Sequence, residues 1–290
     1  MASEQQISRI NDVLYEIHRD TSAELSADVL AKVAAYSEQH FHRVFQEVVG
    51  ESVHQYVRRT RLEQAANQLM FDRKRPVLEV AEQCGFASLS SFTKAFKSTF
   101  GVTPGRWRTE EPDTNDPPYL IDDEIAQAYT RLQAIDLPTP NLVELPEQPV
   151  AYVRHLGYGR DIRLAWQTLQ AWAAAEEQPF ETQLGLHHSN PAWVPLDQCR
   201  YVACLAIDKP ILRKGRVSSM CIPGGLHAAF DLTGVYGELL PYLSKILDQW
   251  LPSSGFRAKT TPAFAHYRNN HFLAPDERFD LTFYLPISLW

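Results

Sequence analysis

Residues 76–108 read PVLEVAEQCGFASLSSFTKAFKSTFGVTPGRWR, and this stretch decides the fold of the first part of the chain. Ser88 is a residue type that caps the start of a helix, and Gly101 is a residue type that ends one. Between them, Phe92 and Phe96 stand four residues apart, which places both rings on one face of the helix. The stretch therefore predicts a short helix, a tight turn and a second, capped helix.

The same pattern occurs earlier in the chain, where residues 30–62 read LAKVAAYSEQHFHRVFQEVVGESVHQYVRRTRL. A shift of 51 positions aligns the caps, the phenylalanines, the helix ends and a later aromatic residue: Ser37 with Ser88, Phe41 with Phe92, Phe45 with Phe96, Gly50 with Gly101 and Tyr56 with Trp107. Upstream of the caps a shift of 50 aligns Ala31 with Ala81 and Ala35 with Gly85, so the second turn is one residue longer. This repeat indicates two helix-turn-helix units, in which the second helix enters the major groove of DNA.

In each copy, the face of the second helix opposite the phenylalanines is predicted to be free. That face carries Gln39, His42, Arg43 and Gln46 in the first copy, and Leu89, Ser90, Thr93, Lys94 and Lys97 in the second. Two copies on one rigid body could contact two successive segments of the major groove.

The chain of 290 residues carries a formal net charge of −7, which taken whole argues against nucleic-acid binding. Residues 1–108 hold 14 lysines and arginines against 13 acidic residues, so the acidity lies in the remainder, with 14 against 22. The basic residues of the first part come in clusters, such as Arg58, Arg59 and Arg61. Clusters on one face can make a local positive surface on a nearly neutral domain.

The length favours two domains, and the residue pattern changes from helical to strand-like after the first of them. Residues 1–108 predict an all-α domain, and residues 109–140 predict an acidic, proline-containing linker with one more helix at 121–135. Residues 141–290 predict an α+β domain, in which strand-like runs alternate with helices at 162–175 and 237–250. The order suggests a strand-helix-strand unit that occurs twice.

Residues 26–108 resemble the DNA-binding domain of the AraC/XylS transcriptional regulators, and GF…SFTKAFK…FGVTPGRWR is the most specific motif. The resemblance implies seven helices in a homeodomain-like double helix-turn-helix fold, with the third and sixth helices contacting the bases of promoter DNA. The matching positions are Gln39, His42 and Arg43 in one copy and Leu89, Ser90, Thr93 and Lys94 in the other.

The chemistry of these side chains favours base recognition by the first copy. Arg43 can donate two hydrogen bonds to guanine, and Gln39 can pair with adenine. The second copy offers mainly methyl contacts and single hydrogen bonds, so we expect it to depend more on the DNA backbone. Its candidate phosphate contacts are Ser88, Lys97 and Arg106.

Residues 141–290 resemble the GyrI-like effector-binding domain through NLVELPEQPVAYVRHLGYG, IPGGLHAAFDLTG and PAFAHYRNN. The family often has a glutamate where this chain has Ala265, and an aspartate where it has Val202. A cleft without these carboxylates favours a neutral hydrophobic ligand over a lipophilic cation. The candidate cleft residues are Trp193, Tyr201, Phe264, Ala265 and Tyr267.

These observations predict a cytoplasmic transcriptional regulator, more specifically an activator, that binds double-stranded DNA and a small-molecule effector and has RNA polymerase as a further candidate partner. We expect no cofactor and no membrane segment, and no metal, since the adjacent pair His187 and His188 lacks a third ligand nearby. Two alternatives remain open: a ligand-sequestering or gyrase-interacting protein, and a small-molecule hydrolase. The second is disfavoured because Ala265 cannot act as a general base, so we expect no enzyme activity.

Overall fold

A computed structural model describes residues 2–109, 118–209, 211, 216–259 and 261–289. The chain divides into two compact units, Met1–Pro112 with Arg213–Ser218 and Asp113–Leu212 with Ser219–Trp290. Of the predicted linker, residues 109–140, residues 110–117 lie outside the described residues, and the helix predicted at 121–135 is present at Asp123–Gln133.

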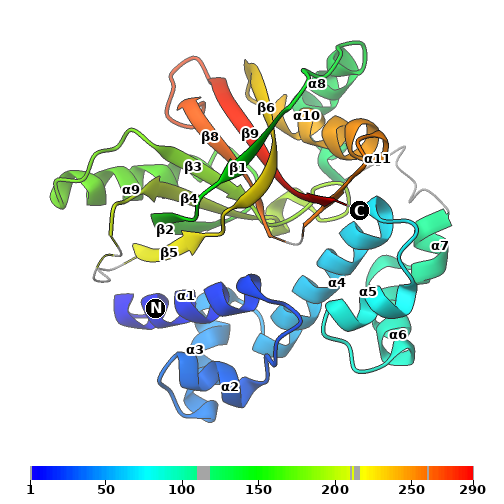
Figure 1. The fold of residues 1–290 in the computed structure, drawn as a ribbon. Helices are drawn as coiled ribbons and strands as arrows, with labels where there is room; N and C mark the ends of the chain where they lie inside the picture. The colour runs from blue at the N-terminus through cyan, green and yellow to red at the C-terminus, as the bar shows by residue number, and fades with distance from the viewer. Residues whose placement is uncertain (1, 110–117, 210, 212–215, 260, 290) are drawn as a thin grey trace. The chain divides into compact units, whose positions relative to one another are not determined.

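The first unit is all-α, as the sequence predicts. Its helices are α1 (Glu4–Arg19), α2 (Ala27–Val33), α3 (Glu38–Val49), α4 (Val53–Phe71), α5 (Val77–Gln83), α6 (Leu89–Phe100) and α7 (Pro104–Thr109). Figure 1 shows α4 running between the pair α2 and α3 and the group α5 to α7. The pairs α2–α3 and α5–α6 are the two predicted helix-turn-helix units.

The two turns begin with the same backbone geometry, although the second is one residue longer. Ala35 and Gly85 both adopt a positive φ, of 52° and 72° respectively. The amide that follows each of them bonds back to the short helix, from Tyr36 N to Ala31 O at 3.0 Å and from Phe86 N to Ala81 O at 2.9 Å. These bonds end the short helices in the same way, since a left-handed residue lets the chain reverse there.

The aromatic residues that align in the two copies make equivalent contacts against α4 and α7. Phe45 packs edge-on against Tyr56 with 5.7 Å between ring centroids, and Phe96 packs edge-on against Trp107 at 5.6 Å. The Trp107 indole also donates a hydrogen bond to Ala66 O in the middle of α4. Helix α4 is thus packed by both copies, which makes the seven helices one body.

The second unit is α+β, with its strands in one sheet. Its helical segments are η1 (Pro118–Ile121), α8 (Asp123–Gln133), α9 (Ile162–Ala175), η2 (Leu196–Gln198), α10 (Leu239–Lys245), η3 (Ile246–Trp250) and α11 (Leu251–Ser253). Its strands are β1 (Asn141–Leu145), β2 (Gln148–Leu156), β3 (Gln183–His187), β4 (Arg200–Ala206), β5 (Ser218–Ile222), β6 (Gly225–Val235), β7 (Phe256–Ala258), β8 (Ala263–Asn269) and β9 (Arg278–Leu289). The strand order is β1-β6-β9-β8-β3-β4-β2-β5, and β7 pairs with β9.

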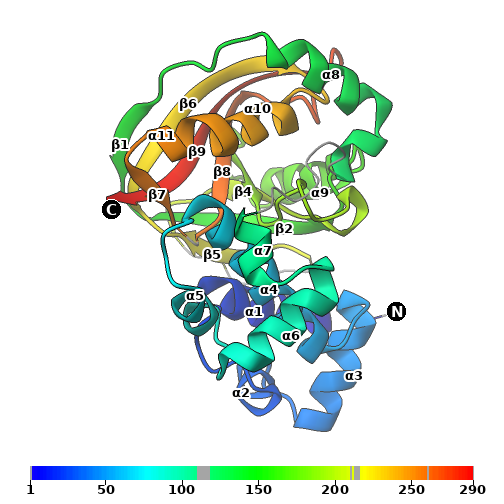
Figure 2. The same cartoon turned by 90° about the vertical axis from the view of Figure 1, so that its right-hand side faces the viewer.

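The order of the strands confirms the predicted repeat. One half contains β2, α9, β3 and β4, and the other contains β6, α10, β8 and β9; β3 and β8 pair at the centre of the sheet. Figure 2 shows α8 and α10 side by side, and the two helices are in contact. The strand-like runs found in the sequence do not include the central strand β3, because it is short and contains Gly185.

The two faces of this sheet differ in the size of their side chains. A row on one face crosses the strand pairs through Phe230, Phe283, Ala265, Gly185, Ala203 and Val153. Helix α9 covers this face, since Trp166 contacts Tyr267 with 5.8 Å between ring centroids. Trp250 contacts Phe230 on the same face. The small residues at the centre of the row therefore lie between two helical segments.

Gly185 has a specific steric role in that row. A Cβ added at Gly185 would overlap the Tyr201 hydroxyl group and the Tyr267 ring. These two tyrosines can lie across the middle of the sheet only because β3 has no side chain there.

Two features are absent from the ranges that the structure describes. No helix there is long and apolar enough to cross a membrane. No group of three or more histidine, cysteine or carboxylate side chains there could hold a metal ion.

The equivalence of the two turns can be tested by exchanging their left-handed residues. We expect Ala35→Gly to stabilise the first unit by about 1 kcal/mol, because glycine adopts a positive φ without steric cost. We expect Gly85→Ala to destabilise it, because Gly85 has the same type of conformation and an added Cβ would also meet the Arg61 guanidinium.

Thermal unfolding followed by circular dichroism measures both changes. A destabilising Ala35→Gly substitution, or a neutral Gly85→Ala substitution, would contradict the equivalence of the turns.

Candidate functional site

Helix α3, the second helix of the first helix-turn-helix pair, presents its polar side chains to solvent. Phe41 and Phe45 are fully buried, whereas Gln39 and Arg43 are exposed and His42 is half-buried. The Arg43 guanidinium donates a hydrogen bond to Nδ1 of His40 at 3.0 Å. The three predicted base contacts therefore lie on one helix, outside the core, with Arg43 placed on the exposed surface by a local contact.

Helix α6 has the same arrangement with a different charge. Phe92 and Phe96 are fully buried, while Leu89 is 41 % exposed. Of the other predicted contacts, Ser90, Lys94 and Lys97 are exposed and Thr93 is half-buried. Helix α6 contains two lysines and no acidic residue, whereas α3 carries Glu38 and Glu47 besides Arg43. A DNA backbone would therefore be attracted more strongly to α6 than to α3.

The start of α6 is capped by a side chain. Ser88 Oγ accepts a hydrogen bond from the Ser91 amide at 3.2 Å. This bond satisfies one of the free amides of the first turn, and the others remain available to an anion. Arg106, the third predicted phosphate contact, is exposed in α7, which packs on α6 through Trp107.

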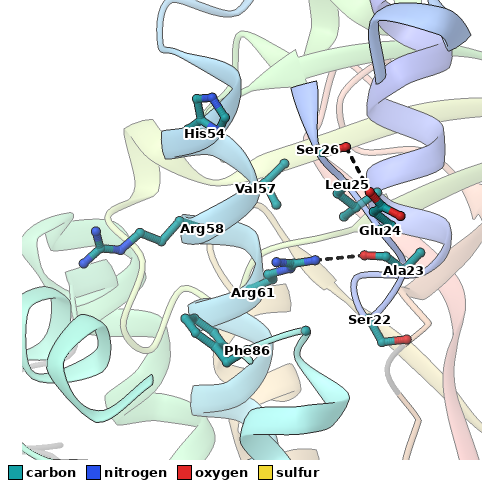
Figure 3. Close-up of a pocket in the computed structure, with 11 residues that line it drawn as sticks. Ser22, Ala23, Glu24, Leu25, Ser26, His54, Val57, Arg58, Arg61 and Phe86 are labelled. Carbon is teal, nitrogen blue, oxygen red and sulfur yellow. Dashed lines mark hydrogen bonds between the residues drawn. The ribbon is translucent and has the colours of Figure 1, made fainter. Parts of the chain in front are cut away.

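A cavity of about 550 Å³ lies between the two helix-turn-helix units (Figure 3). The residues that line it are Ser22, Ala23, Glu24, Leu25, Ser26, His54, Val57, Arg58, Arg61, Gly85 and Phe86. At one edge the His54 ring lies 5.4 Å from the His42 ring on α3, centroid to centroid. At the other edge Gly85 and Phe86 form the turn that precedes α6. The cavity therefore lies next to both candidate recognition helices, α3 and α6.

The basic clusters of the first unit are only partly available for a partner. Arg59 pairs with Glu63 at 3.0 Å and with Glu51, and Arg61 donates to the carbonyls of Thr21 and Ala23 at 2.9 Å. Arg75 pairs with Asp72, and Arg108 donates to Arg75 O. These arginines hold loops and helices together. The local positive surface that such clusters can make therefore comes from fewer residues than the clusters contain.

Arg58, from the same cluster, has an exposed side chain at the cavity edge (Figure 3). It has no partner among the residues described. The sequence does not separate it from Arg59 and Arg61, because the distinction depends on which face of α4 is buried.

In the second unit the structure brings three of the five predicted cleft residues together. Tyr201, Ala265 and Tyr267 lie on the face of the sheet that α9 covers, and the hydroxyl oxygens of the two tyrosines are 3.2 Å apart. Phe264 faces the opposite side, where it stacks on Tyr284, because neighbouring strand residues alternate. Trp193 is half-buried in the turn before β4 and not on a strand.

The predicted cleft is covered by the chain itself. The loop 270–277 places His271 and Phe272 over the tyrosines, with 5.9 Å between the His271 and Tyr267 rings and 5.7 Å between the Phe272 and Tyr201 rings. Tyr201 and Ala265 have no exposed surface. These residues form an aromatic core between the helical segments in the present conformation.

Two histidines in this core lack hydrogen-bond partners among the described residues. They are His187, at both ring nitrogens, and His271, at Nδ1. A buried polar group without a partner costs about 1–3 kcal/mol of stability, so such groups call for an explanation. Burial lowers the pKa of His187 to about 4. Burial, together with the nearby His187 ring, lowers the pKa of His271 to about 3. Both rings are therefore neutral at pH 7.

The family models divide the chain as the two units do. A model described as a helix-turn-helix domain matches residues 30–110, and a model described as a GyrI-like small molecule binding domain matches residues 138–288. The second match covers more than half of the chain.

The curated relatives match a shorter part of the chain. The HTH-type transcriptional activator AarP of Providencia stuartii is 33% identical over 111 residues, which are 38% of this chain and 82% of that protein. The probable transcriptional regulator LumQ of Photobacterium leiognathi is 36% identical over 36% of this chain and 43% of that protein. Transcriptional regulator Rob of Salmonella typhimurium is 37% identical over 34% of each chain. The match thus spans less than half the length of LumQ and Rob.

The neutral state of His187 predicts a pH dependence of stability. An unfolded histidine titrates near its ordinary pKa of 6.5. Between that value and the folded pKa of about 4 the unfolded chain binds a proton that the folded chain does not. The free energy of unfolding therefore falls as the pH falls through this window. We expect His187→Phe to remove about 2 kcal/mol of the loss between pH 7 and pH 5.

Urea unfolding followed by tryptophan fluorescence measures this difference, since five of the six tryptophans lie after residue 109. His54→Phe replaces an exposed histidine of the first unit and is the matched control, because it leaves His187 in place. Equal pH dependence in His187→Phe and the unsubstituted chain would show that His187 titrates normally.

Proposed function

The chain belongs to the GyrI-like family and carries an AraC-type helix-turn-helix domain, and from this we propose that it is a transcriptional regulator that binds promoter DNA through its first unit and a small molecule through its second. The observation that carries the proposal is the duplicated pair of helices α3 and α6, which end at Gly50 and Gly101; only α6 has a side-chain cap, from Ser88. Each buries two phenylalanines and exposes a polar face, and both are packed on α4.

In this proposal α3 and α6 enter successive segments of the major groove. Gln39, His42 and Arg43 contact bases in one segment, and Leu89, Ser90, Thr93 and Lys94 contact the other. Ser88, Lys97 and Arg106 contact phosphates. We add Arg58 as a phosphate contact, because its exposed side chain borders the cavity between the two helix-turn-helix pairs of the first unit.

The second unit supplies the regulation. We propose that it senses a neutral, hydrophobic molecule in the cytoplasm, because Ala265, which lies on the same face of the sheet as Tyr201 and Tyr267, provides no carboxylate that would favour a cation. Activation is the proposed direction of control, following the activator AarP, and RNA polymerase is the proposed partner at the promoter. A hydrolase is disfavoured, because Ala265 places a methyl group where the family often has its glutamate.

The assignment of base and phosphate contacts can be tested with one substitution of each kind. We expect Arg43→Ala to weaken binding to a DNA site selected from the genome by about 10- to 100-fold and to change binding to random DNA little, because an arginine–guanine pair discriminates by about 1–3 kcal/mol. We expect Lys97→Ala to weaken both alike and to reduce the salt slope by about one.

Fluorescence anisotropy with labelled duplexes at several salt concentrations measures these effects. Equal losses of Arg43→Ala on both duplexes would make Arg43 a phosphate contact. Binding of the unsubstituted chain to all sequences alike at physiological salt would overturn the proposed regulator and favour a ligand-sequestering or gyrase-interacting protein.

A further inference from the structure

The loop 270–277 fills the cleft of the second unit with an aromatic ring of the protein's own. Phe272 is only 6 % exposed and packs edge-on against Tyr201. Its ring centroid also lies 4.0 Å from that of His271. An aromatic group is therefore the kind of molecule that this cleft accommodates.

Buried rings and polar side chains together hold the loop in place. His271 and Phe272 are only 4 % and 6 % exposed, and both pack on the tyrosines. Arg163 Nε donates to Phe272 O at 2.8 Å, and Arg160 pairs with Glu277 at 2.7 Å near the surface. Exposed ion pairs contribute little, so the loop is held mainly by the burial of its rings, which an aromatic ligand would replace.

Under the loop lies a polar group that the closed conformation leaves unused. His187 faces the same side of the sheet as Tyr201, its partner across the strand pair, and the two ring centroids are 5.4 Å apart. The rings of Tyr158 and Phe283 pack against it from the other sides, at 5.4 and 6.4 Å. Within the described ranges neither ring nitrogen of His187 has a hydrogen-bond partner.

We propose that the cleft binds a neutral aromatic compound with a hydroxyl group, which takes the place of the Phe272 ring and hydrogen-bonds to His187. A neutral imidazole has one donor and one acceptor nitrogen, and a hydroxyl group can serve either. A cation would lack a counter-charge, since Ala265 provides none, and would lose its hydration on entry. This inference rests on the proposal that the second unit is the effector domain.

The test uses three probes of similar shape with the full chain: 4-ethylphenol, ethylbenzene and 4-ethylbenzylammonium. We expect calorimetric titration to show 4-ethylphenol binding about tenfold more tightly than ethylbenzene, which is the effect of one buried hydrogen bond. The cationic probe should bind more weakly than either. Equal affinity for 4-ethylphenol and ethylbenzene, or strongest binding of the cation, would overturn the proposal.

Four variants locate the effect. His187→Phe should abolish the preference for 4-ethylphenol, and His187→Gln should retain part of it, because glutamine keeps a donor and an acceptor. His266→Phe alters a histidine on the opposite face of β8 and should change nothing. Phe272→Ala should bind 4-ethylphenol more tightly, because the competing ring is gone. A preference that survives His187→Phe, or weaker binding by Phe272→Ala, would contradict the proposal.

The same preparations are titrated with the selected DNA duplex to separate the two proposals. If the unsubstituted chain binds the selected DNA but shows no preference for 4-ethylphenol, only this inference is overturned. If it shows the preference but no selective DNA binding, the proposed regulator is overturned and His187 remains a ligand contact. Circular dichroism spectra identical to that of the unsubstituted chain exclude misfolding as the cause of any loss.

Discussion

Two pairs of aromatic rings, Phe45 on Tyr56 and Phe96 on Trp107, determine the arrangement of the first unit. Aromatic pairs of this kind contribute about 0.5–1.5 kcal/mol beyond the burial of their area. Their larger effect is geometric, because each pair fixes the rotation of one capped helix about its axis. The polar faces of α3 and α6 are exposed because the opposite faces are held by these rings.

The same unit shows why charge must be assessed residue by residue. Arg59 and Arg61 bind carboxylates and loop carbonyls, whereas Arg58, next to them in sequence, remains exposed. The number of positive groups that can meet DNA is thus smaller than the composition suggests. Strong non-specific attraction is not expected from such a surface, so base contacts must supply much of the selectivity.

The sequence predicts much of the fold and less of the sites. The repeat is visible because caps, phenylalanines and turn residues such as Ala35 and Gly85 have local roles that a sequence reveals. Strand alternation separates Phe264 from Ala265 in principle, but only the register shows which of them joins Tyr201. His187 and Phe272 could not be predicted as neighbours, because they meet through a loop that no local pattern specifies.

The central claim is that two helices of one chain contact successive segments of the same DNA. A methylation-protection footprint of the full chain on a duplex selected from genomic DNA tests it most directly, because it reports guanines in the major groove. We expect two protected patches on one face of the duplex, about 10 base pairs apart. A single protected patch, or protection with no sequence preference, would contradict it.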